Sequence, residues 1–214
     1  MKAKYLALLA IAFLLLSSCM KESTKTLYAR QETNIETLVA AQQKANENYT
    51  VTTRDGSTRL TLAAGEGDEL TDDKIISFYY AGYVLSGSSL PAASALFATN
   101  SEEVATAAKW DLTKADETGA DVSGDASADA SEDAAAEEVE EEPDPRYEIL
   151  TVRLSEARFI EGLHNGLLGV KGGEECWIFF SGQHGFGDRK IGMIPANSAI
   201  AYHIWVHSVQ TDAL

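Results

Sequence analysis

Histidine and cysteine are common in metal and nucleophilic sites, and this chain contains four His and two Cys. His203 and His207 lie four residues apart with Trp205 between them, so they would share one face of a strand. A zinc site needs at least one more ligand, so we interpret this pair as part of an outer face. His184 lies in the glycine-rich loop without a visible Asp or nucleophile partner, so we assign it no catalytic role. Cys176 alternates with core-type residues and predicts a buried thiol. We therefore expect no metal and no cofactor.

An aromatic residue in a glycine-rich loop is a stronger indication of a binding site. Phe186 lies between Gly185 and Gly187, with Gly182 close by. An apolar ring in such a loop indicates the lining of an apolar pocket. Three apolar residues of strand-like segments are expected instead to be ordinary core: Ile178, Phe180 and Ile204.

Local patterns indicate which elements would hold these residues. Asp55-Gly56 between two β-rich runs predicts a hairpin with strands over 50–54 and 58–62. Runs rich in β-branched and aromatic residues predict further strands over 74–84, 147–154, 175–180 and 198–209. Short helices are predicted over 101–113 and 159–170. Many strands around one central short helix predict an α+β fold.

A longer helix is predicted upstream of this domain. Thr33 and Glu36 have the spacing of a capping box. Apolar and small residues then recur at helical spacing and predict a helix from Asn34 to Asn48. The polar residues 20–32 are expected to form a tether. The helix would either pack on the main domain or pair with a second copy of the chain as a homodimer.

The first nineteen residues have the pattern of a bacterial lipoprotein signal. Lys2 and Lys4 precede an apolar run, Tyr5 to Leu16, which is followed by Leu16-Ser17-Ser18-Cys19. We expect residues 1–18 to be a signal peptide and Cys19 to carry a lipid anchor. The alternatives are an ordinary signal peptide with an incidental cysteine, or a short buried helix. The expected location is the cell envelope, at the outer membrane, facing the periplasm or the surface.

The net charge of −16 is concentrated in one segment. Residues 115–145 contain 13 acidic residues and no basic residue, so the rest of the chain carries only −3. Such a composition predicts a disordered, solvated insertion, although a partner-binding or calcium-attracting segment is the alternative. The spacing of an Asp-x-Asp-x-Asp-Gly calcium loop is absent from the sequence. The acidic balance argues against nucleic-acid binding.

Six short motifs, in order along the chain, resemble those of the FKBP-type peptidyl-prolyl isomerases. FIEGL at 159–163 is similar to the family's V-I-x-G-W, and VKGGE at 170–174 to its M-x-x-G-E/Q. Phe186-Gly187 resembles Y-G, and IPANS at 194–198 resembles I-P-P-x-[AS]. Upstream, YYAGY at 79–83 resembles V-H-Y-T-G, and LFATN at 96–100 is a variant of F-D-S. Tyr202 lies where the family has an aromatic residue on its last strand.

The resemblance implies a twisted antiparallel sheet wrapped around one short helix, here over residues 50–214. With residues 19–49 as tether and helix, this gives an FKBP-like α+β domain that has an N-terminal helical extension and a disordered acidic insertion. It implies a catalytic pocket formed by Tyr80, Phe97, Ile160, Phe186 and Tyr202. The resemblance also implies that four further residues bind substrate as walls of this pocket: Leu150, Phe159, Leu163 and Ile194. The Ile160 amide would donate to a substrate carbonyl.

The implied activity is cis/trans isomerisation of X-Pro bonds in unfolded or newly exported polypeptides. Three residues depart from the family pattern: Leu163 replaces a Trp, Phe186 replaces a Tyr, and Ala98 replaces an Asp. Retention of Tyr80, Ile160 and Tyr202 favours an isomerase. Ala98 and Leu163 favour the alternative, a weak or inactive FKBP-like module that binds extended apolar segments as a chaperone or assembly factor.

Overall fold

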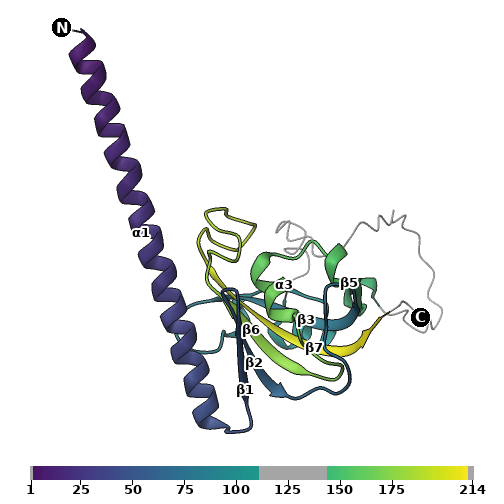
Figure 1. Ribbon diagram of the computed structural model, residues 1–214. Coiled ribbons are helices and arrows are strands. Elements are labelled where there is room, and N and C mark those ends of the chain that lie inside the picture. Colours follow the sequence, from purple (N-terminus) through teal and green to yellow (C-terminus); the bar gives the residue numbers. More distant parts are fainter. Residues whose placement is uncertain (1, 111–143, 212–214) are drawn as a thin grey trace.

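The computed structural model describes residues 2–110 and 144–211, with side chains from residue 23 onward except that of Pro145. Seven strands form one antiparallel sheet in the order β1-β2-β6-β7-β3-β4, and β5 also pairs with β3 (Figure 1). The strands are β1 Thr50–Arg54, β2 Ser57–Ala63, β3 Ile75–Leu85, β4 Leu96–Thr99, β5 Leu150–Arg153, β6 Glu175–Phe180 and β7 Ala199–Gln210. The α+β prediction is confirmed.

Three α-helices accompany the sheet: α1 Lys2–Ala45, α2 Glu102–Ala108 and α3 Glu161–Leu167. Single 3₁₀ turns lie at Ala93–Ala95, Pro145–Tyr147 and Leu154–Glu156. Most of the acidic insertion predicted over 115–145 falls within 111–143, outside the described residues. Among the described residues, no helix combines the length and apolar character needed to cross a membrane.

The β1–β2 hairpin forms where the sequence predicts it. Its two turn residues, Asp55 and Gly56, have φ values of +43° and +80°. Positive φ at both positions gives a turn whose twist matches that of the flanking strands, and Asp-Gly suits that conformation. The turn fixes the register in which Val51 lies opposite Leu60.

The inner face of the sheet packs on α3. Alternate residues of β3, β6 and β7 point to this side, and Phe78, Ile178 and Ile204 are almost completely buried in its core. α3 lies close to the strands because it presents Gly162 to the ring of Phe180 and Gly166 to Ile178. The ordinary core role predicted for Ile178, Phe180 and Ile204 is confirmed.

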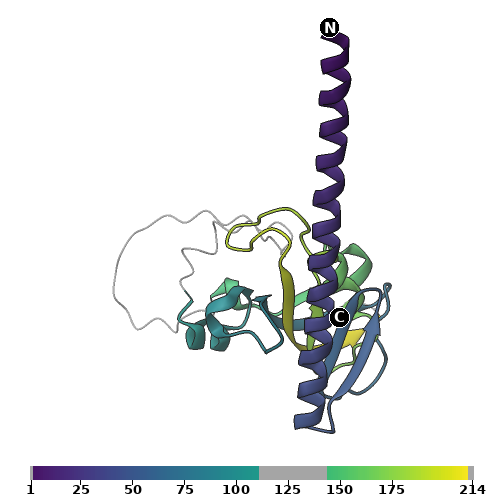
Figure 2. The same ribbon diagram turned by 90° about the vertical axis from the view of Figure 1, so that its left-hand side faces the viewer.

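The outer face packs on α1. Ile35, Leu38 and Val39 are buried in a second apolar cluster that includes Trp177 and Phe179 of β6. Figure 2 shows the C-terminal part of α1 lying along the domain and its N-terminal part extending beyond it. Of the two roles expected for this helix, the structure shows packing on the domain.

Several elements differ in length from the sequence predictions. The segment expected to be a tether, 20–32, is helical, and α1 ends at Ala45 rather than Asn48. Within this segment the side chains of Tyr28 and Gln31 bond to Asn197 of the domain, a contact that the local pattern does not reveal. α3 covers only Glu161–Leu167 because Ile160 is extended and Gly169 has a φ of +84°. The strand β4 was not predicted from its LFAT run.

Candidate active site

The nine side chains that the resemblance assigns to a pocket lie in one apolar cluster on the inner face of the sheet. Four are buried: Phe97, Leu163, Ile194 and Tyr202. Five are half-buried and pack against them: Tyr80, Leu150, Phe159, Ile160 and Phe186. They come from four strands, from α3 and the residues before it, and from the long loop between β6 and β7. The cluster has a buried floor and a partly exposed rim.

Tyr202 lies at the centre of the aromatic floor. Its ring centroid is 5.8 Å from that of Phe97 and 6.2 Å from that of Tyr80, both in edge-to-face arrangements. Such edge contacts are favoured by the ring quadrupoles. Burial, and to a smaller extent Tyr80, raises the pKa of the Tyr202 phenol. The hydroxyl therefore stays neutral and cannot serve as an anionic base at ordinary pH.

Gly82 of β3 allows these rings to meet. A Cβ atom at this position would lie 2.8 Å from the rings of both Phe97 and Tyr202. Any larger residue would push the two rings apart. The glycine in the YYAGY motif is thus explained by the packing of the floor.

Ile160 lies at the start of α3 in an extended conformation, with φ −63° and ψ 149°. Its carbonyl accepts the amides of Leu163 and His164, which begins the helix. Within the described residues, none of the hydrogen bonds uses the Ile160 amide as donor. This amide therefore has the capacity to bond a ligand carbonyl.

Asn100 is a supporting residue that the sequence analysis did not identify. Its buried amide group accepts from the Tyr80 amide at 2.7 Å and donates to the carbonyls of Phe78 and Glu148 at 3.2 and 3.0 Å. It thereby ties the strand that carries Tyr80 to the segment leading into β5. The only sequence signal was an Asn directly after an apolar run.

The histidines do not belong to this apolar cluster, whereas Cys176 is one of its buried members. His203 stacks on Trp177 and contacts Trp205 at ring distances of 4.3 and 3.9 Å, on the outer face as predicted. Cys176 is fully buried, and burial raises the pKa of its thiol, so the predicted unreactive role agrees with its environment.

His184 has a partner that the sequence analysis did not expect. Its Nδ1 lies 3.4 Å from Oε1 of Glu161. Its ring covers Gly56 in the hairpin turn, and its carbonyl accepts the Gly162 amide at 2.8 Å. His184 therefore connects the β6–β7 loop to the hairpin and to α3.

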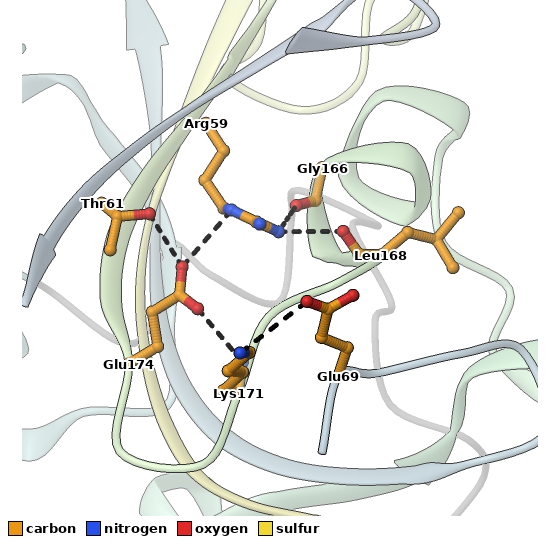
Figure 3. Close-up of polar contacts among 7 residues, drawn as sticks. All are labelled: Arg59, Thr61, Glu69, Gly166, Leu168, Lys171 and Glu174. Carbon is orange, nitrogen blue, oxygen red and sulfur yellow. Dashed lines mark hydrogen bonds and ion pairs between the residues drawn. The ribbon is translucent and has the colours of Figure 1, made fainter. Parts of the chain in front are cut away.

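A buried ion pair holds the C-terminal end of α3 (Figure 3). Arg59 Nε lies 3.3 Å from Glu174 Oε1, and Arg59 Nη1 donates to the carbonyls of Gly166 and Leu168 at 3.0 and 2.9 Å. Glu174 also accepts from Thr61 Oγ1 at 2.9 Å and from the Lys171 amide at 3.1 Å. A cation beside the last carbonyls of a helix is favourable. This network orients α3, and hence Ile160 and Leu163 at its other end.

Among the described residues, no three His, Cys, Asp or Glu side chains lie together as a metal site. The described residues of the cluster are apolar and aromatic, and the Ile160 amide at its rim is available as a donor.

A family model matches the C-terminal part of the chain. Residues 129–207 match a family model described as FKBP-type peptidyl-prolyl cis-trans isomerase. This part of the chain is similar to the FKBP-type isomerases. The described part of the match contains Leu150, α3, the β6–β7 loop and Tyr202, whereas Tyr80 and Phe97 precede it. A search of curated protein sequences found no match to this chain.

Three solved structures are similar to this chain at low sequence identity. A peptidyl-prolyl cis-trans isomerase from Pseudomonas syringae pv. tomato is 14% identical, with a TM-score of 0.50 over 87% of this chain and 96% of that one. FkpA from Escherichia coli is 15% identical, with a TM-score of 0.49 over 94% of this chain and 70% of that one. The three FKBP domains of wheat FKBP73 are 16% identical, with a TM-score of 0.49 over 77% of this chain; the match spans about half, 52%, of that protein. The Pseudomonas structure supports the FKBP-like fold.

Proposed function

We propose that this chain accelerates the cis/trans isomerisation of X-Pro bonds in extended polypeptides through the aromatic cluster of its FKBP-type domain. The observation that supports the proposal is the convergence of nine apolar residues from distant parts of the chain into a buried floor and an accessible rim. A proline ring is apolar and rigid, so a floor of Phe97, Leu163 and Tyr202 suits it.

The proposed mechanism moves no proton and forms no covalent bond. An X-Pro bond favours trans by only about 0.5–1 kcal/mol, but it interconverts over tens to hundreds of seconds because the planar amide is stabilised by resonance. In the transition state the amide is twisted and resonance is lost. A site that binds this twisted form better than the planar forms lowers the barrier.

Two features of the cluster would provide this preference. The apolar walls offer little polar solvation to the planar, more polar ground state. The Ile160 amide would hold a substrate carbonyl and fix the chain on one side of the proline while the other side rotates. Phe159 and Phe186 would flank the residue before or after the proline.

A second function is a binding module with little catalysis. Ala98 is buried on β4, at the position where the FKBP family has an Asp. Leu163 lies in the floor of the aromatic cluster, at the position where the family has a Trp. The first change removes a polar group, and the second gives a smaller apolar surface. These substitutions favour binding of extended apolar segments without rapid turnover.

The deciding experiment measures exchange between cis and trans forms of a short Leu-Pro peptide by NMR, with the purified chain at substoichiometric concentration. We expect exchange to quicken, and Phe186→Ala to reduce the acceleration about ten-fold, because this half-buried ring contributes to the rim. His207→Ala, on the exposed outer face, is the control and should leave the rate unchanged. Exchange no faster than that of the peptide alone would reject the isomerase and favour the binding module.

We further propose that the protein acts in the cell envelope, on newly exported chains, and is held at the membrane by acylation of Cys19. The support is the sequence pattern of residues 2–19. Cells that express Cys19→Ser should release the protein from the membrane fraction and incorporate no labelled fatty acid into it. Retention of the label in this variant would contradict the anchor.

A further inference from the structure

The β6–β7 loop, residues 181–198, carries two residues of the aromatic cluster, Phe186 at its rim and Ile194 in its floor. Its two ends come together at a narrow neck. A Cβ atom on Gly182 would lie only 2.7 Å from the carbonyl carbon of Asn197. Two backbone bonds extend the neck into the loop: Asn197 donates to the Gly187 carbonyl at 2.6 Å, and Gly187 donates to the Gly182 carbonyl at 3.0 Å.

Side chains of α1 bond to both sides of this neck. Gln31 Nε2 donates to the Asn197 carbonyl at 2.7 Å, and Gln31 Oε1 accepts from the Gly182 amide at 2.9 Å. One amide group therefore bridges the outgoing and returning segments of the loop. Tyr28 donates to Asn197 Oδ1 at 2.6 Å, and Glu32 accepts from Ser181 Oγ at 3.3 Å.

The helix that supplies these side chains is firmly placed. Gln31 and Glu32 lie three and four residues after Tyr28, and the buried Ile35 lies four and three residues after them, so these residues share one face of the helix. One face of α1 therefore contacts the sheet in its last turns and the loop one to two turns earlier. Figure 2 shows the loop, in yellow, beside the middle of α1.

Of the α1 side chains that bond to the neck, Gln31 is the one that bonds to the backbone of both segments. Gly182 is buried, so its amide would lose its acceptor without gaining water if Gln31 were truncated. An unsatisfied buried amide is costly. The least costly response is for the neck to open, which would displace Gly187 and the adjacent Phe186. Asn197, in a left-handed conformation with φ +59°, belongs to the same neck.

We infer that Gln31 of α1 is a positioning residue for the β6–β7 loop. The docked N-terminal helix, which lies outside the FKBP-like fold, thereby sets the shape of the rim of the aromatic cluster. The inference rests on the proposed isomerase function for its catalytic consequence, but the positioning itself is a separate structural statement. It gives the helix a role in substrate binding although, from residue 23 onward, no side chain of α1 belongs to the aromatic cluster.

The test compares Gln31→Ala with Thr37→Ala in the full chain. Thr37 is exposed on the same helix, and its hydroxyl bonds only within the helix, to the Thr33 carbonyl. Amide hydrogen exchange followed by NMR should quicken at Gly182 and Gly187 in Gln31→Ala, by about ten-fold or more. It should remain unchanged at Ile178 in the core strand β6. Thr37→Ala should change none of these three amides.

The same two variants are then assayed for isomerisation. We expect kcat/KM to fall about three- to ten-fold in Gln31→Ala, mainly through a higher KM, because the rim is less ordered in the free protein. Thr37→Ala should match the wild-type chain. Equal quickening at Ile178 would mean general destabilisation and would overturn the inference, as would unchanged exchange at Gly187. If the wild-type chain does not isomerise the peptide, the proposed function fails, while the exchange data still decide whether Gln31 positions the loop.

Discussion

At the scale of single residues, His203 shows how burial outweighs a nearby charge. Glu175 Oε1 lies 2.9 Å from His203 Nε2 and favours the charged imidazole. Burial among Trp177 and Trp205 has the larger effect, so the pKa of His203 is lowered from its ordinary value of 6.5. Between the folded and unfolded pKa values, the unfolded chain binds more protons than the folded one.

The lowered pKa of His203 makes the stability of the folded chain depend on pH. The contribution of His203 to stability is present above about pH 6.5 and is lost as the pH falls through the lower pKa of the folded state. We expect urea unfolding to show a smaller free-energy loss between pH 7.5 and 5 in His203→Gln than in the wild-type chain. His207→Gln, on an exposed position, should retain the wild-type loss. An identical pH profile for His203→Gln and wild type would contradict this assignment.

Also at the scale of single residues, loss of the buried Arg59–Glu174 ion pair should lower the free energy of unfolding far more than loss of a surface ion pair. Both side chains are about nine-tenths buried, so Glu174→Gln leaves the Arg59 charge without its anion. Removal of one partner of a buried pair typically costs about 3–5 kcal/mol. Glu156→Gln removes the partner of Arg153 in an exposed pair and should cost less than about 1 kcal/mol. Urea unfolding of the two variants measures the contrast, and equal losses would show that the buried network has no special role.

At the scale of elements, the close approach of α3 to the sheet depends on its glycines. A Cβ atom on Gly166 would lie 2.2 Å from Cγ2 of Ile178, which is a severe overlap. Alanine is ordinarily the better helix former by about 1 kcal/mol. We nevertheless expect Gly166→Ala to destabilise the domain by about 1–3 kcal/mol, because α3 must move away from β6.

Gly172→Ala is the matched control for this prediction. Its nearest neighbours would lie at 3.7 Å, an ordinary contact distance. Thermal or urea unfolding should place this variant within about 0.5 kcal/mol of the wild-type chain. The displacement of α3 in Gly166→Ala should also weaken peptide binding, because Ile160 and Leu163 move with the helix. A Gly166→Ala variant with the free energy of unfolding of the wild-type chain would contradict the prediction, because the contact between α3 and β6 would then have adapted to the added methyl group without loss of stability.

At the scale of the whole molecule, α1 is part of the folded unit. Leu38 is completely buried between this helix and the outer face of the sheet. Truncation of such a residue to alanine usually costs about 2–5 kcal/mol. We expect Leu38→Ala to lower the free energy of unfolding of the entire domain by this amount, in one cooperative transition. Thr37→Ala, one residue earlier and exposed, should have almost no effect. A separate early transition of the helix alone would contradict a single cooperative unit.

Local sequence patterns predicted many of the described elements correctly. The Asp55-Gly56 turn, the strand at 175–180 and the strand at 198–209 follow from turn chemistry and from alternation of apolar residues, which act over a few neighbours. The family motifs then grouped nine residues that the fold places in one cluster. β4 was missed because LFAT is too short and too uniformly apolar to show a period.

The sequence by itself therefore determined the class of the fold, the resemblance to the FKBP-type isomerases and the apolar character of the candidate site, because these depend on residue types and short spacings. Only the tertiary structure decided that Gln31 bonds to Gly182 and Asn197, that Asn100 holds β3 at Tyr80, and that Glu161 faces His184. Gln31 and Asn197 are 166 residues apart. Such contacts depend on how α1, the sheet and the β6–β7 loop pack together, and no local pattern of residues encodes that arrangement.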